Sequence, residues 1–276
     1  MFKDITIGQY IPGNSPLHKL FPMLKIIFTV LYIVVLFLLK KPLSYVIFTV
    51  YTAALVLLSG VSVKIILKGL RPMLWILVFT AVINLFMTPG EVVWSLPIWR
   101  FSLKITREGI IQCVTMTIRL FYLITGTSLL TLTTSPLQLT DGIEKLLKPL
   151  NKFRVPSFEI AMMMTIAIRF IPTLAEETDK IIKAQTARGA DFQTGSIVRR
   201  ARAMVPLLVP LFVSAFRRAD ELATAMEARC YNGGEGRTRM KESRMTKADV
   251  AAIIVFAACA ALVLTVEYVK ISSFIH

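Results

Sequence analysis

Long apolar runs separated by short polar segments dominate the first half of the chain, and one more lies near its end. A bilayer core of about 30 Å needs roughly 17–25 mostly apolar residues in a helix. The runs that approach or meet this length are Ile26–Leu39, Pro42–Val63, Pro72–Met87, Gly109–Leu132 and Val250–Val266. The first is short, but Lys25 and Lys40 on its flanks can extend toward the membrane interface. The pattern predicts an all-α membrane protein with about five transmembrane helices.

The segment between the fourth and fifth runs has a different pattern. Residues 141–247 carry dense charges of both signs, interrupted by apolar stretches such as FEIAMMMTIAI and MVPLLVPLFVSAF. A soluble loop would not carry so much apolar surface, and a spanning helix would not carry so many charges. Amphipathic helices at the cytoplasmic membrane face fit both features. We therefore expect a four-span region over 1–140, a cytoplasmic domain of amphipathic helices over 141–247 and a last transmembrane helix over 248–276.

Local signals predict two charged helices in this cytoplasmic domain. Thr173, with Glu176 three residues later, forms a capping box that predicts a helix start, and Gly189 suits the left-handed turn that ends a helix. A second helix is expected over FRRADELATAMEARCY, with a stop at Asn232–Gly234. Prolines are expected to break the longer helices into pieces at Pro172, Pro206 and Pro210. Each charged helix ends in an Ala-Arg pair, so the chain repeats one basic element at two helix ends.

The charge balance predicts the orientation in the membrane. The chain carries 32 lysines and arginines against 17 acidic residues, a net charge of +15. Basic residues concentrate in cytoplasmic segments, so the central domain and the N-terminus should lie on the cytoplasmic side of the membrane and the C-terminus outside. The 64–71 loop is then cytoplasmic and the 88–108 loop external. This orientation explains the basic charge without nucleic acid, whose binding would leave the apolar spans unexplained.

Enzyme chemistry has little support in the residue pattern. The three cysteines are scattered, the two histidines stand near opposite ends, and no predicted span carries paired acids. The chain has no G-x-x-x-x-G-K-[ST] phosphate-binding loop, so it is not expected to hydrolyse ATP itself. We expect no catalytic residues, no metal ligands and no cofactor. Asn84 and Arg119 are the notable polar residues within spans, and they serve either helix packing or a substrate path.

With these features the chain resembles the T component of energy-coupling factor (ECF) transporters. The segment YIPGNSPLHKLFPMLKI at Tyr10–Ile26 is similar to that family's G-x-S-x-x-H-x-L-x-P-x-x-K entry to the first span. The elements Ala187–Gly189 and Ala228–Cys230 resemble its paired Ala-Arg-Gly signatures. The layout of four spans, a long cytoplasmic helical region and a final span is also similar. The resemblance covers essentially the whole chain.

The resemblance implies a non-enzymatic scaffold. T components join two cytoplasmic ABC-type ATPases to an exchangeable, substrate-binding S component, for uptake of vitamins or metal ions. Their two coupling helices dock into the ATPases, and the signature arginines, here Arg188 and Arg229, reach acidic residues there. An arginine fork can bind a carboxylate through two hydrogen bonds, and Ala187 and Ala228 would leave room for close approach. The alternative is an arginine stabilised at a helix C-terminus by about 0.3–1 kcal/mol.

Cys230 departs from the signature, which has glycine at that position. A positive φ angle would strain cysteine, so Asn232–Gly234 is expected to supply the turn instead. Met162, Met163 and Met164 serve either helix packing or contact with S components, because methionine surfaces adapt to different partners. Two other functions stay open. One is a conventional ABC permease subunit with its own substrate path, and the other is a membrane-bound enzyme, which would need an acidic metal cluster.

Overall fold

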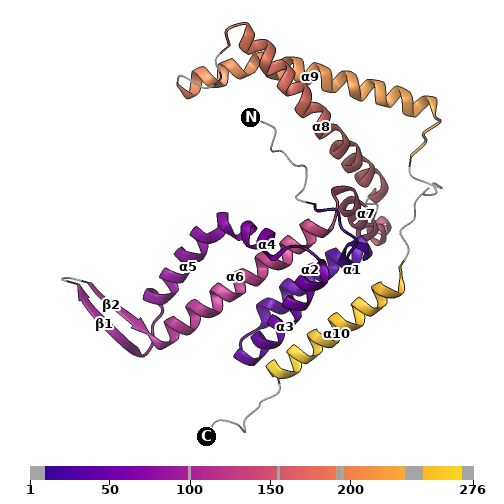
Figure 1. The fold of residues 1–276 in the computed structure, drawn as a ribbon. Coiled ribbons are helices and arrows are strands. Elements are labelled where there is room, and N and C mark those ends of the chain that lie inside the picture. Colours follow the sequence, from indigo (N-terminus) through magenta and orange to yellow (C-terminus); the bar gives the residue numbers. More distant parts are fainter. Residues whose placement is uncertain are drawn as a thin grey trace. The chain divides into compact units, whose positions relative to one another are not determined.

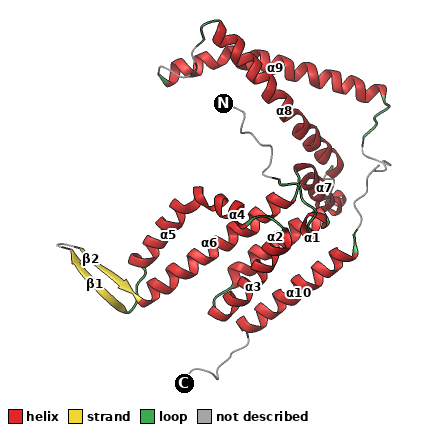
Figure 2. Cartoon of the chain, in the orientation of Figure 1, coloured by secondary structure: helices red, strands yellow, loops and turns green. Residues whose placement is uncertain are grey.

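A computed structural model of the chain describes residues 10–98, 101–153, 156–190, 192, 196–233 and 245–268. The chain divides into two compact units. The bundle unit comprises Gly8–Ser135 and Ser243–His276, and the arm unit consists mainly of Pro136–Glu242. Figure 1 follows the chain through both units, and Figure 2 shows that helices make up most of the described residues. The chain leaves the bundle unit for the arm unit after Ser135 and returns to the bundle unit at Ser243.

The helices of the bundle unit begin and end at recognisable local signals. Their bounds are α1 Pro16–Lys19, α2 Pro22–Leu38, α3 Pro42–Ser59, α4 Val63–Leu70, α5 Leu74–Met87, α6 Arg107–Thr133 and α10 Lys247–Tyr268. Pro16, Pro22 and Pro42 each occupy the first residue of a helix, where a missing N–H breaks no helical hydrogen bond. Gly60 ends α3 in the left-handed conformation, with a φ angle of 67°.

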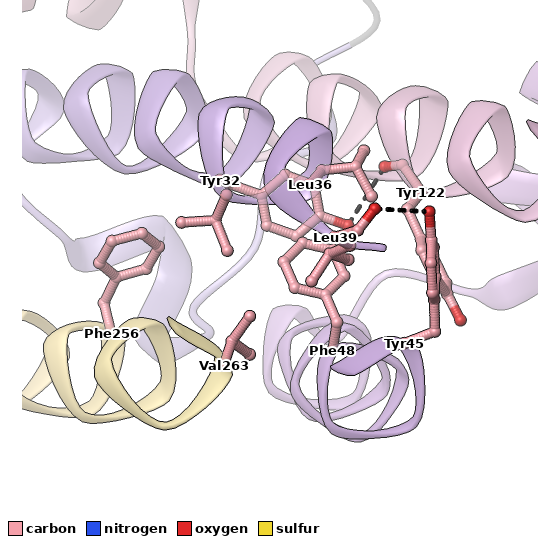
Figure 3. Close-up of a cluster of buried hydrophobic side chains, with 9 residues drawn as sticks. Tyr32, Leu36, Leu39, Tyr45, Phe48, Tyr122, Phe256 and Val263 are labelled. Carbon is pink, nitrogen blue, oxygen red and sulfur yellow. Dashed lines mark hydrogen bonds between the residues drawn. The ribbon is translucent and has the colours of Figure 1, made fainter. Parts of the chain in front are cut away.

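The core of the bundle unit lies where α2, α3, α6 and α10 meet (Figure 3). Its buried hydrophobic residues are Tyr32, Val35, Leu36, Leu39, Tyr45, Phe48, Tyr122, Phe256 and Val263. The Phe48 ring lies 4.7 Å from the Tyr32 ring and 5.6 Å from the Tyr122 ring, measured between centroids. Aromatic pairs at such separations stabilise a core beyond the area that they bury.

Polar groups in this core pair with one another. The Tyr32 hydroxyl lies 3.1 Å from the Thr52 hydroxyl and donates to the Tyr122 carbonyl at 3.2 Å. Gly126 of α6 permits this approach, because a Cβ atom there would lie 2.5 Å from the Tyr32 ring. Small residues let membrane helices come close enough for such bonds. α2 and α6 are therefore joined by close approach as well as by side-chain packing.

Within the described residues, five helical stretches are long and apolar enough to cross a membrane: Pro42–Ser59, Val63–Met87, Arg107–Thr133, Ser157–Ala187 and Lys247–Tyr268. Three of them contain a predicted span, and Pro42–Ser59 covers most of the predicted span Pro42–Val63. The remaining predicted span, Ile26–Leu39, forms α2, which has 17 residues. The prediction of an all-α membrane protein with about five transmembrane helices is confirmed. The other stretch, Ser157–Ala187, is one that the sequence pattern assigns to the cytoplasmic domain.

Two segments predicted as loops contain regular structure. The 64–71 segment is α4, which continues through a 3-10 turn at Arg71–Met73 into α5. The loop prediction is wrong there because an amphipathic helix can carry Lys64 and Lys68 on its polar side. The 88–108 segment contains an antiparallel hairpin of β1 Val92–Ile98 and β2 Phe101–Thr106. This hairpin adds a small β element to an otherwise helical bundle unit.

The arm unit contains α7 Pro136–Leu147, a 3-10 turn at Lys148–Phe153, α8 Ser157–Ala187 and α9 Ile197–Ala228. The predicted breaks are wrong, since α8 runs through Pro172 and α9 runs through Pro206 and Pro210. The predicted helix start at Thr173 is wrong as well, because it lies inside α8. A proline removes one backbone hydrogen bond, and helices of 31 and 32 residues keep many others. The predicted domain boundary at 140/141 falls within α7.

Candidate functional site

Helices α8 and α9 cross, and a hydrogen-bonded ion pair joins them at the crossing (Figure 1). Glu177 of α8 accepts hydrogen bonds from the Ser214 hydroxyl at 2.5 Å and from the Arg218 guanidinium at 3.1 Å. Ser214 and Arg218 are four residues apart and so lie on one face of α9. The Glu177 and Arg218 side chains are 25% and 35% exposed. This charge-assisted, partly shielded contact lies where the two helices meet.

The first Ala-Arg element forms the C-terminus of α8. Arg188 is the cap residue, and the Gly189 amide donates to the Thr186 carbonyl at 2.9 Å. The Ala190 amide donates to the Gln185 carbonyl at 3.0 Å, which completes a Schellman motif. Gly189 has a φ angle of 86°, in the left-handed region that this motif requires. The prediction that Gly189 ends the helix is confirmed.

The second Ala-Arg element forms the C-terminus of α9 with the same pattern of bonds. The Cys230 amide donates to the Glu227 carbonyl at 2.8 Å, and the Tyr231 amide donates to the Met226 carbonyl at 3.0 Å. Arg229 therefore occupies the same position in its motif as Arg188 does in the first. The two helix ends are equivalent in backbone geometry, although their sequences differ.

Cys230 adopts the left-handed conformation itself, with a φ angle of 55°. It is the sole described non-glycine residue with positive φ. The expectation that Asn232–Gly234 supplies this turn is wrong: Gly233 has a φ angle of 80° but follows a turn already made at Cys230, and Gly234 lies outside the described residues. The Schellman bonds hold Cys230 in place because they satisfy carbonyls that would otherwise lack partners.

All six predicted docking residues are exposed: Ala187, Arg188, Gly189, Ala228, Arg229 and Cys230. They form two separate tips, one at the end of each long helix. Arg188 stands eleven residues beyond Glu177, and Arg229 stands eleven residues beyond Arg218. With a rise of 1.5 Å per residue, the C-terminal part of each helix extends about 16 Å past the crossing contact. The candidate site is therefore a pair of equivalent basic tips on crossing helices.

The polar residues noted within the predicted spans pack against helix backbone. Arg119 donates to the Leu39 carbonyl at 2.9 Å and to the Tyr45 hydroxyl at 3.0 Å. Leu39 caps the C-terminus of α2, where carbonyls lack helical donors. Asn84 donates to the Thr80 carbonyl of its own helix at 2.8 Å. These contacts favour packing over a substrate path for both residues.

The three consecutive methionines of α8 do not share one surface. Successive residues of a helix point about 100° apart. Met163 is 58% exposed, whereas Met162 and Met164 are half-buried. Their contact with an S component stays a prediction, and Met163 is the methionine whose side chain is exposed for such a contact.

A larger apolar surface, which the sequence reasoning did not single out as a contact surface, follows α9. Its residues are 44–69% exposed and recur at spacings of three or four: Met204, Val205, Leu208, Val209, Phe212, Val213 and Phe216. We call this surface the apolar stripe of α9. The signal was present in MVPLLVPLFVSAF as helical periodicity. The prolines in that stretch predicted a broken helix, so no continuous stripe was expected.

The fold and the helix tips define the class of protein: a multi-pass, mainly helical membrane protein with an exposed, duplicated basic element. Residues 13–240 match the family model described as cobalt transport protein, CbiQ. The chain belongs to this family.

Relatives of closely similar length support the same grouping. The chain is 56% identical to the energy-coupling factor transporter transmembrane protein EcfT of Ruminiclostridium cellulolyticum over 269 residues, 98% of this chain and 99% of the relative. Identity to the protein of the same name from Thermosediminibacter oceani is 59% over 252 residues, 91% of this chain and 94% of the relative. Identity to the Bacillus subtilis protein of the same name is 45% over 263 residues, 95% of this chain and 98% of the relative. The predicted family resemblance is confirmed.

Proposed function

We propose that the chain is the transmembrane coupling subunit of an ECF-type importer and has no catalytic activity of its own. Two cytoplasmic ABC-type ATPases hydrolyse ATP, and the chain passes their movement to a membrane S component that takes up a vitamin or a metal ion. The pair of equivalent Ala-Arg tips carries this proposal. Two ATPases need two docking elements, whereas a conventional ABC permease subunit usually presents one.

The chemistry of the tips suits docking to an acidic groove. Arg188 and Arg229 are exposed where their helices end, and each follows an alanine that leaves space for a partner. A guanidinium binds a carboxylate through two parallel hydrogen bonds, which a lysine ammonium cannot reproduce. A helix-end charge alone does not explain why the second tip keeps its turn at Cys230. The left-handed conformation costs a residue with a side chain about 1–2 kcal/mol.

The expected orientation places both tips on the cytoplasmic side of a prokaryotic cell membrane, where the ATPases would be. The excess of basic residues supports this orientation, because cytoplasmic segments of membrane proteins are rich in lysine and arginine. The arm unit, which contains the crossing helices, then serves as the coupling domain predicted over 141–247.

The apolar stripe of α9 supports a second partner, the S component. Contiguous exposed apolar surfaces of this kind mark contacts with other proteins or with lipid. An S component is itself a membrane protein, so its surface can match a stripe rather than a polar groove. Met163 of α8 would add an adaptable side chain to this contact. The stripe therefore extends the predicted contact from the methionines of α8 to α9.

Co-purification of the detergent-solubilised complex tests the docking proposal. We expect Arg188→Glu with Arg229→Glu to remove the ATPases, because each change places an acidic side chain against acidic groove residues. Each single variant should retain less ATPase than the wild type. Arg188→Lys should bind more weakly than arginine but better than glutamate, since lysine keeps the charge and loses the two-bond geometry.

Arg217→Glu is the matched control on α9. The Arg217 side chain is 82% exposed, and its replacement makes the same charge change away from the tip. We expect this variant to keep its ATPases. If the control loses them as readily as the tip variants, net charge and not docking at the tips controls assembly. If the wild type brings down no ABC-type ATPase, the coupling proposal is wrong.

A further inference from the structure

A polar cluster centred on three buried side chains, His18, Lys25 and Asp249, lies in the bundle unit, close along the chain to both connections with Pro136–Glu242. The chain leaves the bundle unit two residues after Thr133, the last residue of α6, and re-enters it three residues before Thr246, which precedes α10. The cluster is formed by Ser15, His18, Lys25, Thr246 and Asp249, all within the bundle unit. The docking proposal does not use any of these residues.

On the outgoing side, the N-terminal segment holds the last turn of α6. The final carbonyls of a helix lack donors within the helix. The Ile11 amide donates to the Leu132 carbonyl at 3.0 Å, and the Lys25 ammonium donates to the Thr133 carbonyl at 2.9 Å. Lys25 also donates to the His18 carbonyl at 3.0 Å and is only 6% exposed. Lys25 thus ties the start of α2 to the end of α6.

His18 fixes the segment that makes these bonds. Its Nε2 atom lies 2.9 Å from the Ile11 carbonyl, and its Nδ1 atom lies 2.6 Å from the Ser15 hydroxyl. A carbonyl only accepts hydrogen bonds, so Nε2 donates to Ile11, while Nδ1 shares a hydrogen bond with the Ser15 hydroxyl. Gly13 packs against the ring, because a Cβ atom there would lie 2.8 Å from a ring carbon. The histidine therefore holds Ile11 in the position from which it bonds α6.

On the returning side, one carboxylate organises two helix starts. Asp249, which is 1% exposed, accepts bonds from the Thr246 amide at 2.6 Å and from the Thr246 hydroxyl at 2.8 Å. The carboxylate at the third residue of α10 thus caps the Thr246 amide, which is one half of a capping box. The other carboxylate oxygen accepts the Phe21 amide at 2.7 Å, at the N-terminus of α2. The negative charge also suits the positive ends of both helix dipoles.

The opposite end of α10 has a chemically similar contact. Glu267 accepts the Lys41 amide at 3.2 Å and the Ser44 hydroxyl at 2.9 Å, at the N-terminus of α3. The Lys41 ammonium donates to the Val266 carbonyl at 2.8 Å. These contacts join helices as the polar cluster does, but they lie far along the chain from the connections at Ser135 and Ser243. They provide a control within the same helix.

We infer that Lys25 and Asp249 are positioning residues that transmit movement between the arm unit and the bundle unit. They hold the end of α6 and the start of α10, so a pull on either connection moves the bundle helices rather than unwinding their last turns. The inference rests on the proposed coupling function. Without the cluster, the ATPases would still dock at the tips, but their movement would be lost at the two connections.

Hydrogen exchange of the full complex, with an ATP analogue and then with ADP, tests this inference. The readout is the nucleotide-dependent difference in amide exchange of α2 and α3. We expect Lys25→Met and Asp249→Asn to reduce this difference roughly 2- to 30-fold, the range typical of substitutions that alter coupling. The ATPases should remain bound. Lys41→Met and Glu267→Gln, the matched changes at the other end of α10, should leave the difference near the wild-type value.

Two milder substitutions serve as a second test in case the complex with Asp249→Asn does not assemble. Thr246→Val and Ser44→Ala each remove one hydroxyl donor to a carboxylate of α10, at 2.8 and 2.9 Å. Only Thr246→Val should reduce the nucleotide response. The inference is overturned if both ends respond alike, or if an assembled wild-type complex shows no nucleotide response in α2 and α3. A wild type that binds no ATPase overturns the coupling function and this inference with it.

Discussion

Phe48 in the bundle unit is 2% exposed, whereas Phe216 in the arm unit is 69% exposed. The charged groups differ in the same way. Lys25 and Asp249 of the bundle unit are buried among backbone partners, while Arg188 and Arg229 at the arm tips are exposed. The bundle unit therefore provides partners for its own central residues. The arm unit presents both apolar and cationic groups outward, which supports its proposed role as the part that contacts other proteins.

Substitution of the two phenylalanines should give the largest contrast. We expect Phe48→Ala to lower the free energy of unfolding by about 3–5 kcal/mol, because it leaves a cavity among Tyr32 and Tyr122. Phe216→Ala should change it by less than about 0.5 kcal/mol, as for other surface positions. Thermal unfolding of the purified chain in detergent measures both. Equal losses would show that the exposed stripe is packed in the isolated chain.

Glycine substitutions test how tightly the bundle helices approach. Gly126→Ala should destabilise by about 1–3 kcal/mol, since the new Cβ atom would lie 2.5 Å from the Tyr32 ring. Gly69→Ala is the control, because the nearest atom to its Cβ position is 3.9 Å away. There alanine should be neutral or stabilising, as it favours helix. A stable Gly126→Ala protein would contradict the close approach of α2 and α6.

Exchanging the residues at the two tips sharpens the comparison within the arm unit. Cys230→Gly should stabilise the end of α9 by about 1 kcal/mol, because glycine adopts positive φ without steric cost. Gly189→Cys should destabilise the end of α8 by a similar amount, about 1 kcal/mol. Nothing lies within 4 Å of the Cβ position at Gly189, so backbone strain alone is measured. Local hydrogen exchange at each helix end reports these changes, and the same sign at both tips would contradict their equivalence.

The smallest effect is expected at the exposed ion pair of α9. Arg217 and Glu221 are 3.8 Å apart, with side chains 82% and 71% exposed. Arg217→Ala should therefore change the free energy of unfolding by no more than about 0.5 kcal/mol. The pair between Arg218 and Glu177, which is more shielded and joins two helices, should have the larger coupling energy in a double-mutant cycle. The reverse order would show that the crossing does not depend on this contact.

Local patterns were sufficient for the parts of the fold that depend on local physics. Apolar runs predicted the bundle helices, since a span needs only enough consecutive apolar residues. Gly189 was identified as a helix end because glycine alone readily takes left-handed backbone. Thr173 and Pro172 misled the prediction in α8. Their signals are short-range, whereas contacts along a long helix decide whether it continues.

The sequence by itself determined the membrane class, the approximate spans and the two arginines at helix ends, because hydrophobicity, charge and capping act over a few neighbouring residues. Only the tertiary structure decided that Glu177 meets Arg218, and that α8 and α9 extend equally beyond this contact. It also decided that Cys230 takes the left-handed backbone conformation that glycine favours. It also brought Lys25 to Thr133 and Asp249 to Phe21. These contacts join residues far apart in the chain, so their partners are selected by packing rather than by any local pattern.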